Sequence, residues 1–179
     1  DSDRPRQHYT KPIAFDNEGY LYTSFGAPSD ACQEADRSPL SPGIDPCPLL
    51  EKRAGIWRFK ADKKGQFQED GEKYATGLRS IVGLDWNDQD NNLFAVVHGR
   101  DYLHNTWPRE FNAWEGAVLP SEVFLKLERG ANAGWPYHYF DQIKGKYFLN
   151  PEYGGDGEKQ GEVSHLAPVT VGFLGHFAP

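Results

Sequence analysis

The sequence predicts an all-β fold that forms part of a β-propeller. Of its 179 residues, 19 are Gly, 13 are Pro and 14% are aromatic, and few stretches have the periodicity of a long helix. Such a composition is typical of short strands joined by many turns. Short apolar runs bounded by turn residues also recur along the chain, which indicates repeated blades of a propeller.

The repeats can be followed strand by strand. We expect strands, in chain order, at residues 13–16, 20–25, 55–59, 66–74, 81–86, 93–97 and 123–127. Residues 82–85 repeat the pattern of residues 13–16, and the apolar residues 171–173 begin a third copy. The chain therefore holds roughly two and a half blades of about four strands each.

An incomplete set of blades cannot close a ring, so we expect residues 1–179 to form a partial propeller domain within a longer chain. The chain starts at Asp1 and contains no Met, which predicts that a signal peptide or longer N-terminal region precedes it. A β-sandwich is the alternative fold, although its strands normally recur every 8–12 residues without such long loops.

Charge and hydropathy restrict the partners. A formal net charge of −7 argues against a nucleic-acid-binding protein, which needs a basic face. No apolar run approaches the roughly 18 residues of a membrane helix, so no membrane span is expected. The acidic surplus supplies carboxylates for Ca²⁺, or it only keeps the protein soluble.

Cys32 and Cys47 are the only cysteines, and they lie in a Pro-rich loop, residues 26–48. Their simplest interpretation is a disulfide bond that closes this loop, which predicts an oxidising compartment. The alternative is a pair of free thiols in a cytosolic protein.

The stretch 76–101 predicts a binding site. A hairpin of strands 81–86 and 93–97 brings Arg79 and Ser80 to the same end as His98, Gly99 and the two residues that follow. A cation, an imidazole and a glycine backbone then surround one point, which suits an anionic ligand or a metal. Alternatively, Arg79 forms an ordinary ion pair with Asp85 or Asp101.

Two further candidates lie next to predicted strands. His8 precedes the first inner strand, and an imidazole with a pKa near neutrality suits a general base. Glu122 precedes strand 123–127 and is a candidate metal ligand. Either side chain is equally compatible with an ordinary surface role.

Four strings in order, GIWRF, TGLRSIVGL, LFAVVHGRD and GANAGWPY, resemble the glucose/sorbosone dehydrogenase family. These are soluble quinoproteins on a six-bladed propeller, and the sorbosone-dehydrogenase branch is the most similar. The resemblance covers the chain from about His8 to its end. It implies a pyrroloquinoline quinone (PQQ) cofactor held on Ca²⁺.

The resemblance also implies roles for individual residues. His8 matches the base that takes the proton from the sugar hydroxyl, and Arg79 matches the arginine that binds the cofactor's carboxylates. Ser80 stands where soluble glucose dehydrogenases have Asn, and His98 stands where they have Gln beside the quinone. The family's remaining cofactor contacts, a lysine and further arginines, would lie beyond Pro179.

The implied metal ligands follow the second hairpin strand. Gly99 and Arg100 match the pair whose backbone carbonyls hold the cofactor's Ca²⁺, with Arg100 in place of a proline. Glu122 matches an acid of a second, structural Ca²⁺ site.

The predicted function is therefore that of a secreted or periplasmic PQQ-dependent dehydrogenase of a sugar or related alcohol or aldose. Its electrons would pass to an external acceptor such as a cytochrome. Two alternatives remain open: a catalytically inactive propeller that serves as a binding module, and a Ca²⁺-dependent propeller lactonase.

Overall fold

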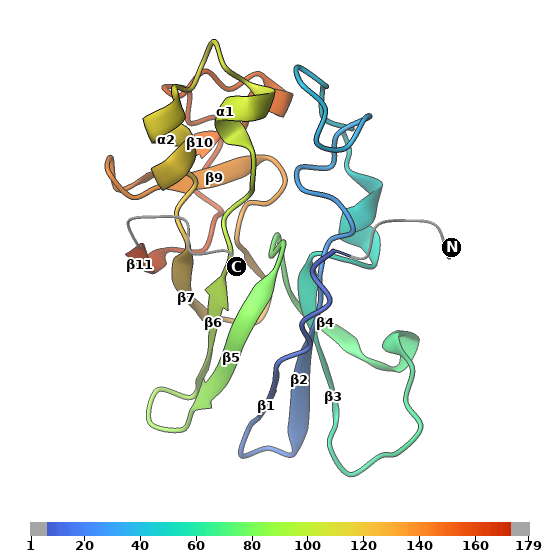
Figure 1. Ribbon diagram of the computed structural model, residues 1–179. Helices are drawn as coiled ribbons and strands as arrows, with labels where there is room; N and C mark the ends of the chain where they lie inside the picture. The colour runs from blue at the N-terminus through green and yellow to red at the C-terminus, as the bar shows by residue number, and fades with distance from the viewer. Residues whose placement is uncertain (1–6, 173–179) are drawn as a thin grey trace.

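A computed structural model describes residues 7–172 of the chain. Two antiparallel sheets stand side by side, and β1 of the first lies next to β5 of the second (Figure 1). The first sheet has the order β1-β2-β3-β4-β8, and the second has the order β11-β7-β6-β5. The all-β prediction is thus confirmed for most of the chain.

The first sheet contains four antiparallel strands and one short parallel addition. Its strands are β1 Ile13–Phe15, β2 Tyr20–Phe25, β3 Gly55–Lys60, β4 Glu72–Thr76 and β8 Ala131–Asn132. The turn between β1 and β2 forms because the carboxylate of Asp16 accepts the backbone N–H groups of Glu18 and Tyr20, at 2.9 and 2.8 Å. The predicted outer strand 66–74 is shifted, because a 3₁₀ turn occupies Gln68–Asp70 before β4 begins.

The second sheet repeats the four-stranded arrangement. It consists of β5 Ile81–Asn87, β6 Asn92–Val97, β7 Val123–Leu127 and β11 Val169–Gly172. The side chain of Asn87 accepts the N–H of Gln89 at 2.9 Å, which closes the tight turn before β6. Val169 and Val171 pair with β7, so the expected third copy at residue 171 is wrong: these residues are the fourth strand of the second sheet. Phe173 lies outside the described residues.

A shared core joins the two sheets. Tyr22 of the first sheet stacks on Trp86 of the second, with ring centroids 5.5 Å apart, and meets Tyr74 edge to face at 5.0 Å. Leu93, Leu125 and other fully buried aliphatic residues extend the core. Packing of this kind fixes the two sheets relative to each other.

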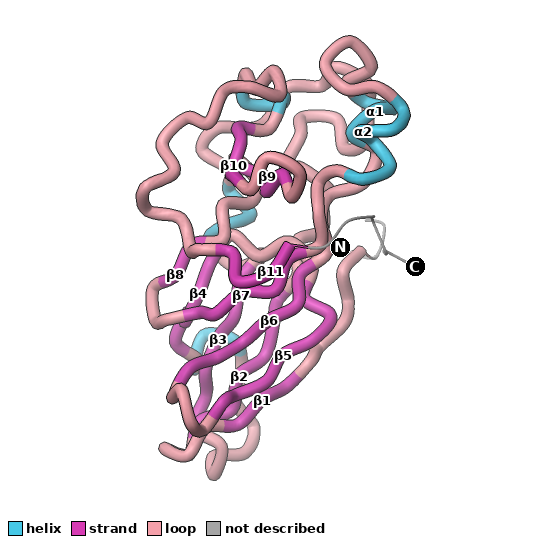
Figure 2. Tube along the Cα trace, turned by 90° about the vertical axis from the view of Figure 1, so that its left-hand side faces the viewer, coloured by secondary structure: helices cyan, strands magenta, loops and turns pink. Residues whose placement is uncertain are grey.

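Helices and a β-hairpin lie at one end of the two sheets (Figure 2). Its elements are α1 Leu103–Thr106, α2 Ala113–Val118, β9 His138–Asp141 and β10 Lys146–Leu149. A separate apolar cluster, which includes Leu103, Phe111 and Tyr139, holds them together. Among residues 7–172, no helix has the length and apolar character needed to cross a membrane.

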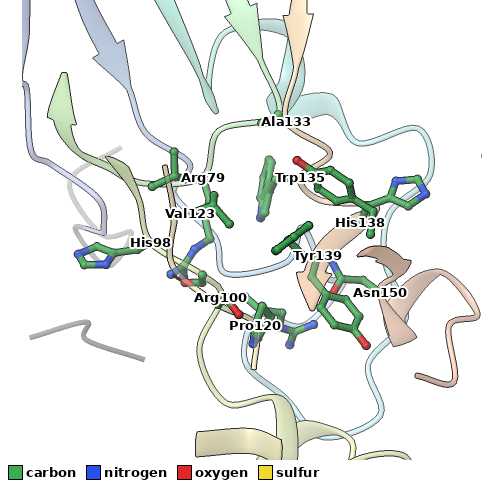
Figure 3. Close-up of a pocket in the computed structure, with 16 residues that line it drawn as sticks. Arg79, His98, Arg100, Pro120, Val123, Ala133, Trp135, His138, Tyr139 and Asn150 are labelled. Atoms are coloured by element: carbon green, nitrogen blue, oxygen red, sulfur yellow. Dashed lines mark hydrogen bonds between the residues drawn. The ribbon is translucent and has the colours of Figure 1, made fainter. Parts of the chain in front are cut away.

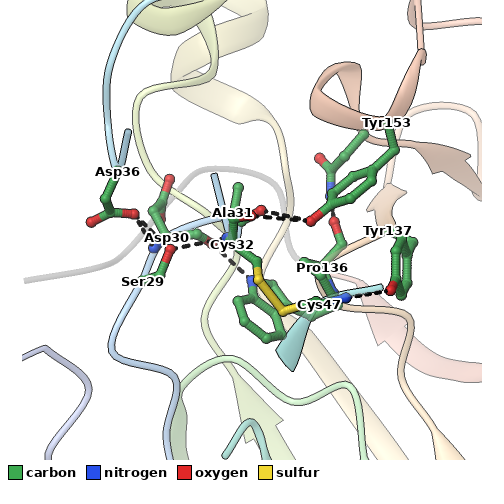
Figure 4. The surroundings of a disulfide bond; sticks show 11 residues. Ser29, Asp30, Ala31, Cys32, Asp36, Cys47, Pro136, Tyr137 and Tyr153 are labelled. Atoms are coloured by element: carbon green, nitrogen blue, oxygen red, sulfur yellow. Dashed lines mark hydrogen bonds between the residues drawn. A yellow bond between two sulfur atoms is a disulfide. The ribbon is translucent and has the colours of Figure 1, made fainter. Parts of the chain in front are cut away.

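The loop 26–48 packs at the same end and is closed by the predicted disulfide between Cys32 and Cys47 (Figure 4). The Tyr137 hydroxyl accepts the N–H of Cys47 at 2.9 Å, and the Tyr153 hydroxyl donates to the carbonyl of Ala31 at 3.1 Å. The indole N–H of Trp135 donates to the carbonyl of Asp30 at 2.8 Å. The loop is thus an integral wall of the domain and we refer to it as the disulfide loop.

Removing the disulfide should lower stability. The two cysteines are 15 residues apart, and closing a loop of that length contributes about 3 kcal/mol in the chain-entropy model. We expect the Cys32→Ala/Cys47→Ala variant of the full-length protein to lose about that free energy of unfolding in urea titrations. Reduction of the wild type should produce the same loss, and a variant as stable as the oxidised wild type would contradict the prediction.

Candidate functional site

The ends of strands from both sheets meet at one place. His98, directly after β6, donates its backbone N–H to the carbonyl of Ser80 at 2.9 Å, and Ala27, after β2, donates to the carbonyl of Arg79 at 2.9 Å. The Thr10 hydroxyl donates to the carbonyl of Ile81 at 2.8 Å, which holds the segment before β1 against the second sheet. The predicted hairpin end is therefore joined to the start of the first sheet.

A cleft of about 680 Å³ opens at this point, and we call it the strand-end cleft. It brings together four residues predicted from sequence: His8, Arg79, Ser80 and His98. Eight further residues line it, and four of these carry polar groups from the disulfide loop and from the segment after β6: Arg37, Asp101, Tyr102 and Asn105. A smaller cavity of about 50 Å³ adjoins it, since Arg79 and His98 line both (Figure 3).

The imidazole of His8 is anchored through Nδ1. Its Nδ1 lies 2.6 Å from the carbonyl oxygen of Ala27; because a carbonyl only accepts, Nδ1 carries the hydrogen and Nε2 carries the lone pair. Burial lowers the pKa of His8 below its ordinary value of 6.5, and the positive charge of Arg79 lowers it further. A Cβ at Gly26 would lie 2.3 Å from the His8 carbonyl oxygen, so glycine is required beside this residue.

Arg79 is committed to groups of this chain. Its side chain is 3% exposed, and its Nη1 forms an ion pair with Asp30 and lies 3.4 Å from Asp101. Its Nη2 donates to the carbonyl of Gly99. The ion-pair alternative is thus confirmed for Asp101, and Asp30 takes the place proposed for Asp85. The Nε of Arg79 is buried and has no hydrogen-bond partner among the described residues.

The side chain of Arg100 continues the buried ionic network. Its Nη1 pairs with the carboxylate of Glu152, and its Nε lies 3.7 Å from the second oxygen of Asp30. Glu152 also accepts from the indole N–H of Trp107 at 2.7 Å and from the amide of Gln33 at 3.1 Å. Asp30 therefore bridges two buried arginines.

The predicted calcium ligands are arranged differently from a metal site. The Gly99 carbonyl accepts from Arg79, and its N–H donates to a carboxylate oxygen of Glu122 at 2.5 Å. The same oxygen lies 3.3 Å from Nδ1 of His98. Within residues 7–172, no group of three or more His, Cys, Asp or Glu side chains has the arrangement of a metal site. The Gly99 carbonyl and the Glu122 carboxylate are therefore engaged within the chain, and the Ca²⁺ roles of Gly99, Arg100 and Glu122 stay predictions.

Sequence reasoning missed the acidic partners of the site because they come from distant segments. Asp30 and Glu152 are 49 and 52 residues from the arginines that they pair with. Arg37 was overlooked because it lies in the disulfide loop, which looked like an insertion away from the strand ends. The one available signal was Asp101, which directly follows the predicted site residues.

Comparisons with known proteins place the fold. No family model and no curated protein sequence matches the chain. Several solved structures do match, and the chain has the fold of one portion of each of them. The calcium structure of a carbohydrate-active enzyme of family AA12 from Trichoderma reesei matches with a TM-score of 0.65 and 15% identity, covering 95% of this chain and 44% of that one.

Two further matches carry sugar dehydrogenase names. The PQQ domain of pyranose dehydrogenase from Coprinopsis cinerea matches with a TM-score of 0.60 and 18% identity, covering 82% of this chain and 38% of that one. The soluble aldose sugar dehydrogenase from Escherichia coli matches with a TM-score of 0.52 and 15% identity, covering 91% of this chain and 39% of that one. The chain spans less than half the length of these structures. The resemblance predicted from the sequence is thus confirmed at the level of the fold.

The buried network makes Asp30 sensitive to substitution. Asp30→Ala leaves Arg79 and Arg100 without the carboxylate that they share, and breaking a buried ion pair in this way costs about 3–5 kcal/mol. We expect that loss of unfolding free energy in urea titrations of the full-length protein. The exposed Asp62→Ala should change stability by less than about 0.5 kcal/mol. Equal stability of the two variants would contradict the bridging role.

Proposed function

We propose that the chain is part of a PQQ-dependent oxidoreductase that oxidises a sugar or a related alcohol or aldose. The observation that carries the proposal is the strand-end cleft, which is lined by arginine side chains and by His8, whose imidazole is bonded to the Ala27 carbonyl through Nδ1. The fold likeness to sugar dehydrogenases supports it. The disulfide agrees with work in an oxidising compartment, as a secreted or periplasmic protein.

The cleft suits the quinone better than it suits calcium. Arg37 and Arg79 each have a buried Nε without a hydrogen-bond acceptor among the described residues, and arginine is well matched to a carboxylate. We propose that the arginine side of the cleft, to which the buried Arg79 contributes its charge, faces the cofactor's carboxylates, with Ser80 and His98 beside it. The Gly99 carbonyl accepts from Arg79 and so does not offer that lone pair to a metal.

His8 would act as the base. Its Nε2 accepts the proton of the substrate hydroxyl, while the Ala27 carbonyl holds the Nδ1 hydrogen and stabilises the imidazolium that forms. When bound, the quinone supplies an acceptor for the hydride that leaves the carbinol carbon. The substrate thus loses one proton and one hydride and becomes a carbonyl compound. An external electron acceptor would complete the cycle.

The function is tested with the full-length protein. We expect PQQ to bind in a fluorescence titration with Ca²⁺ present, and we expect the loaded protein to reduce a dye when a sugar is added. The absence of both quinone binding and sugar-dependent dye reduction would overturn the proposal.

The pH dependence tests His8. Because the neutral imidazole is the active form and its pKa lies below 6.5, kcat/KM should rise with pH through that pKa and then level off. His8→Gln should slow the reaction by about 100-fold to 10,000-fold. His165 is exposed, so His165→Gln is the matched control and should keep the wild-type kcat/KM and pH profile. The role of His8 as the base would be contradicted if kcat/KM rose with an apparent pKa above 6.5. It would also be contradicted if His8→Gln kept the same rise of kcat/KM with pH.

A binding module without redox activity is the second candidate. The bond between Arg79 and the Gly99 carbonyl favours it, because both groups are already satisfied within the chain. This candidate predicts that PQQ or another anion binds without sugar-dependent dye reduction.

A further inference from the structure

We infer that Arg37, on the disulfide loop, is an anion-binding residue at the mouth of the strand-end cleft and takes a carboxylate group of the ligand. Insofar as the ligand is the quinone, the inference rests on the proposed function.

Arg37 is fixed from three sides. Its backbone N–H donates to the side-chain oxygen of Gln33 at 2.9 Å, and its Nη2 donates to the carboxylate of Asp101 at 2.8 Å. The guanidinium also lies over the ring of Tyr102, 4.9 Å from its centroid. Little conformational entropy therefore remains to be lost when a ligand pairs with it.

Arg37 and Arg79 both line the cleft, but only Arg37 reaches solvent appreciably. The side chain of Arg37 is 32% exposed, whereas that of Arg79 is 3% exposed and uses Nη1 and Nη2 on this chain's own oxygens. A guanidinium has five N–H donors. The hydrogen bond to Asp101 uses one donor of Nη2. The Nε donor is buried, so a ligand would pair with the remaining donors of Nη1 and Nη2.

The charges around Arg37 favour direct pairing with an anion over long-range attraction of the anion to the cleft. In the described network three arginines, Arg37, Arg79 and Arg100, face three carboxylates, those of Asp30, Asp101 and Glu152. Because the charges of these six described groups balance, the network itself supplies little net positive field for an anion. The partly exposed guanidinium of Arg37 is therefore the group that can pair directionally with an anion. Asp101 lies within ion-pair distance of both Arg37 and Arg79.

The test compares binding of PQQ to the full-length protein and three variants by equilibrium dialysis. Charge-assisted hydrogen bonds of this type are worth about 10-fold to 100-fold in affinity, so we expect Arg37→Gln to raise the Kd by that factor. The Kd of Arg37→Lys should lie between those of the wild type and Arg37→Gln, since lysine keeps the charge but lacks the planar guanidinium. The exposed Arg109→Gln is the control and should bind as the wild type does.

Stability separates a binding role from a structural one. The Arg37–Asp101 pair is partly exposed, so Arg37→Gln should unfold at nearly the wild-type temperature. If Arg37→Gln binds PQQ with the wild-type Kd, the inference is overturned. It is also overturned if the affinity falls only in step with a large loss of stability.

A wild type that fails to bind PQQ would count against the proposed function, and citrate then decides the inference. Citrate carries several carboxylates but has no quinone chemistry. Binding of citrate that Arg37→Gln weakens about tenfold would support Arg37 as an anion-binding residue. No citrate binding by the wild type, or equal binding by Arg37→Gln, would overturn it.

Discussion

The fully buried carboxylate of Asp30 is the group on which the strand-end cleft depends. It pairs with Arg79, which precedes β5, and with Arg100, which follows β6, and it accepts the backbone N–H of Asp101 at 3.0 Å. The carbonyl of the same residue accepts the indole of Trp135. A charge removed from water is tolerated only with such partners, so the segments that supply them are fixed relative to one another.

The covalent and apolar contacts of the disulfide loop support this ionic arrangement. Asp30 lies two residues before Cys32, whose disulfide packs in an apolar cluster with Ala27, Ala54 and Trp135. The loop therefore presents its carboxylate to the arginines from a constrained backbone. The same backbone carries Arg37 to the mouth of the cleft, so one loop supplies both the buried anion and the accessible cation.

Local patterns predicted most strands, because alternation and turn chemistry act within a few residues. The Asn87 turn and the strands on either side of it are examples. β11 was misassigned since its apolar residues do not say which strand they pair with. The short α1 and α2 were missed because four and six residues give no helical periodicity.

The candidate site divides in the same way. His8, Arg79, Ser80 and His98 could be placed together because strand ends define a common edge. The partners of the arginines could not, because Asp30 and Glu152 come from segments whose position is set by tertiary packing. Strand patterns in a sequence can thus identify the residues that face a cleft, but they do not identify the distant residues that pair with them.

Gly99 shows why a glycine signature needs the structure. Sequence reasoning placed glycine there so that a ligand or cation could come close, but a Cβ at this position would lie 2.2 Å from the carbonyl oxygen of Pro120. The N–H of Gly99 is bonded to Glu122 and its carbonyl to Arg79. The cation that this carbonyl meets is therefore a guanidinium of the chain itself. A ligand that enters the cleft must displace that bond or pair with the exposed guanidinium, and pairing with Arg37 leaves the buried network intact.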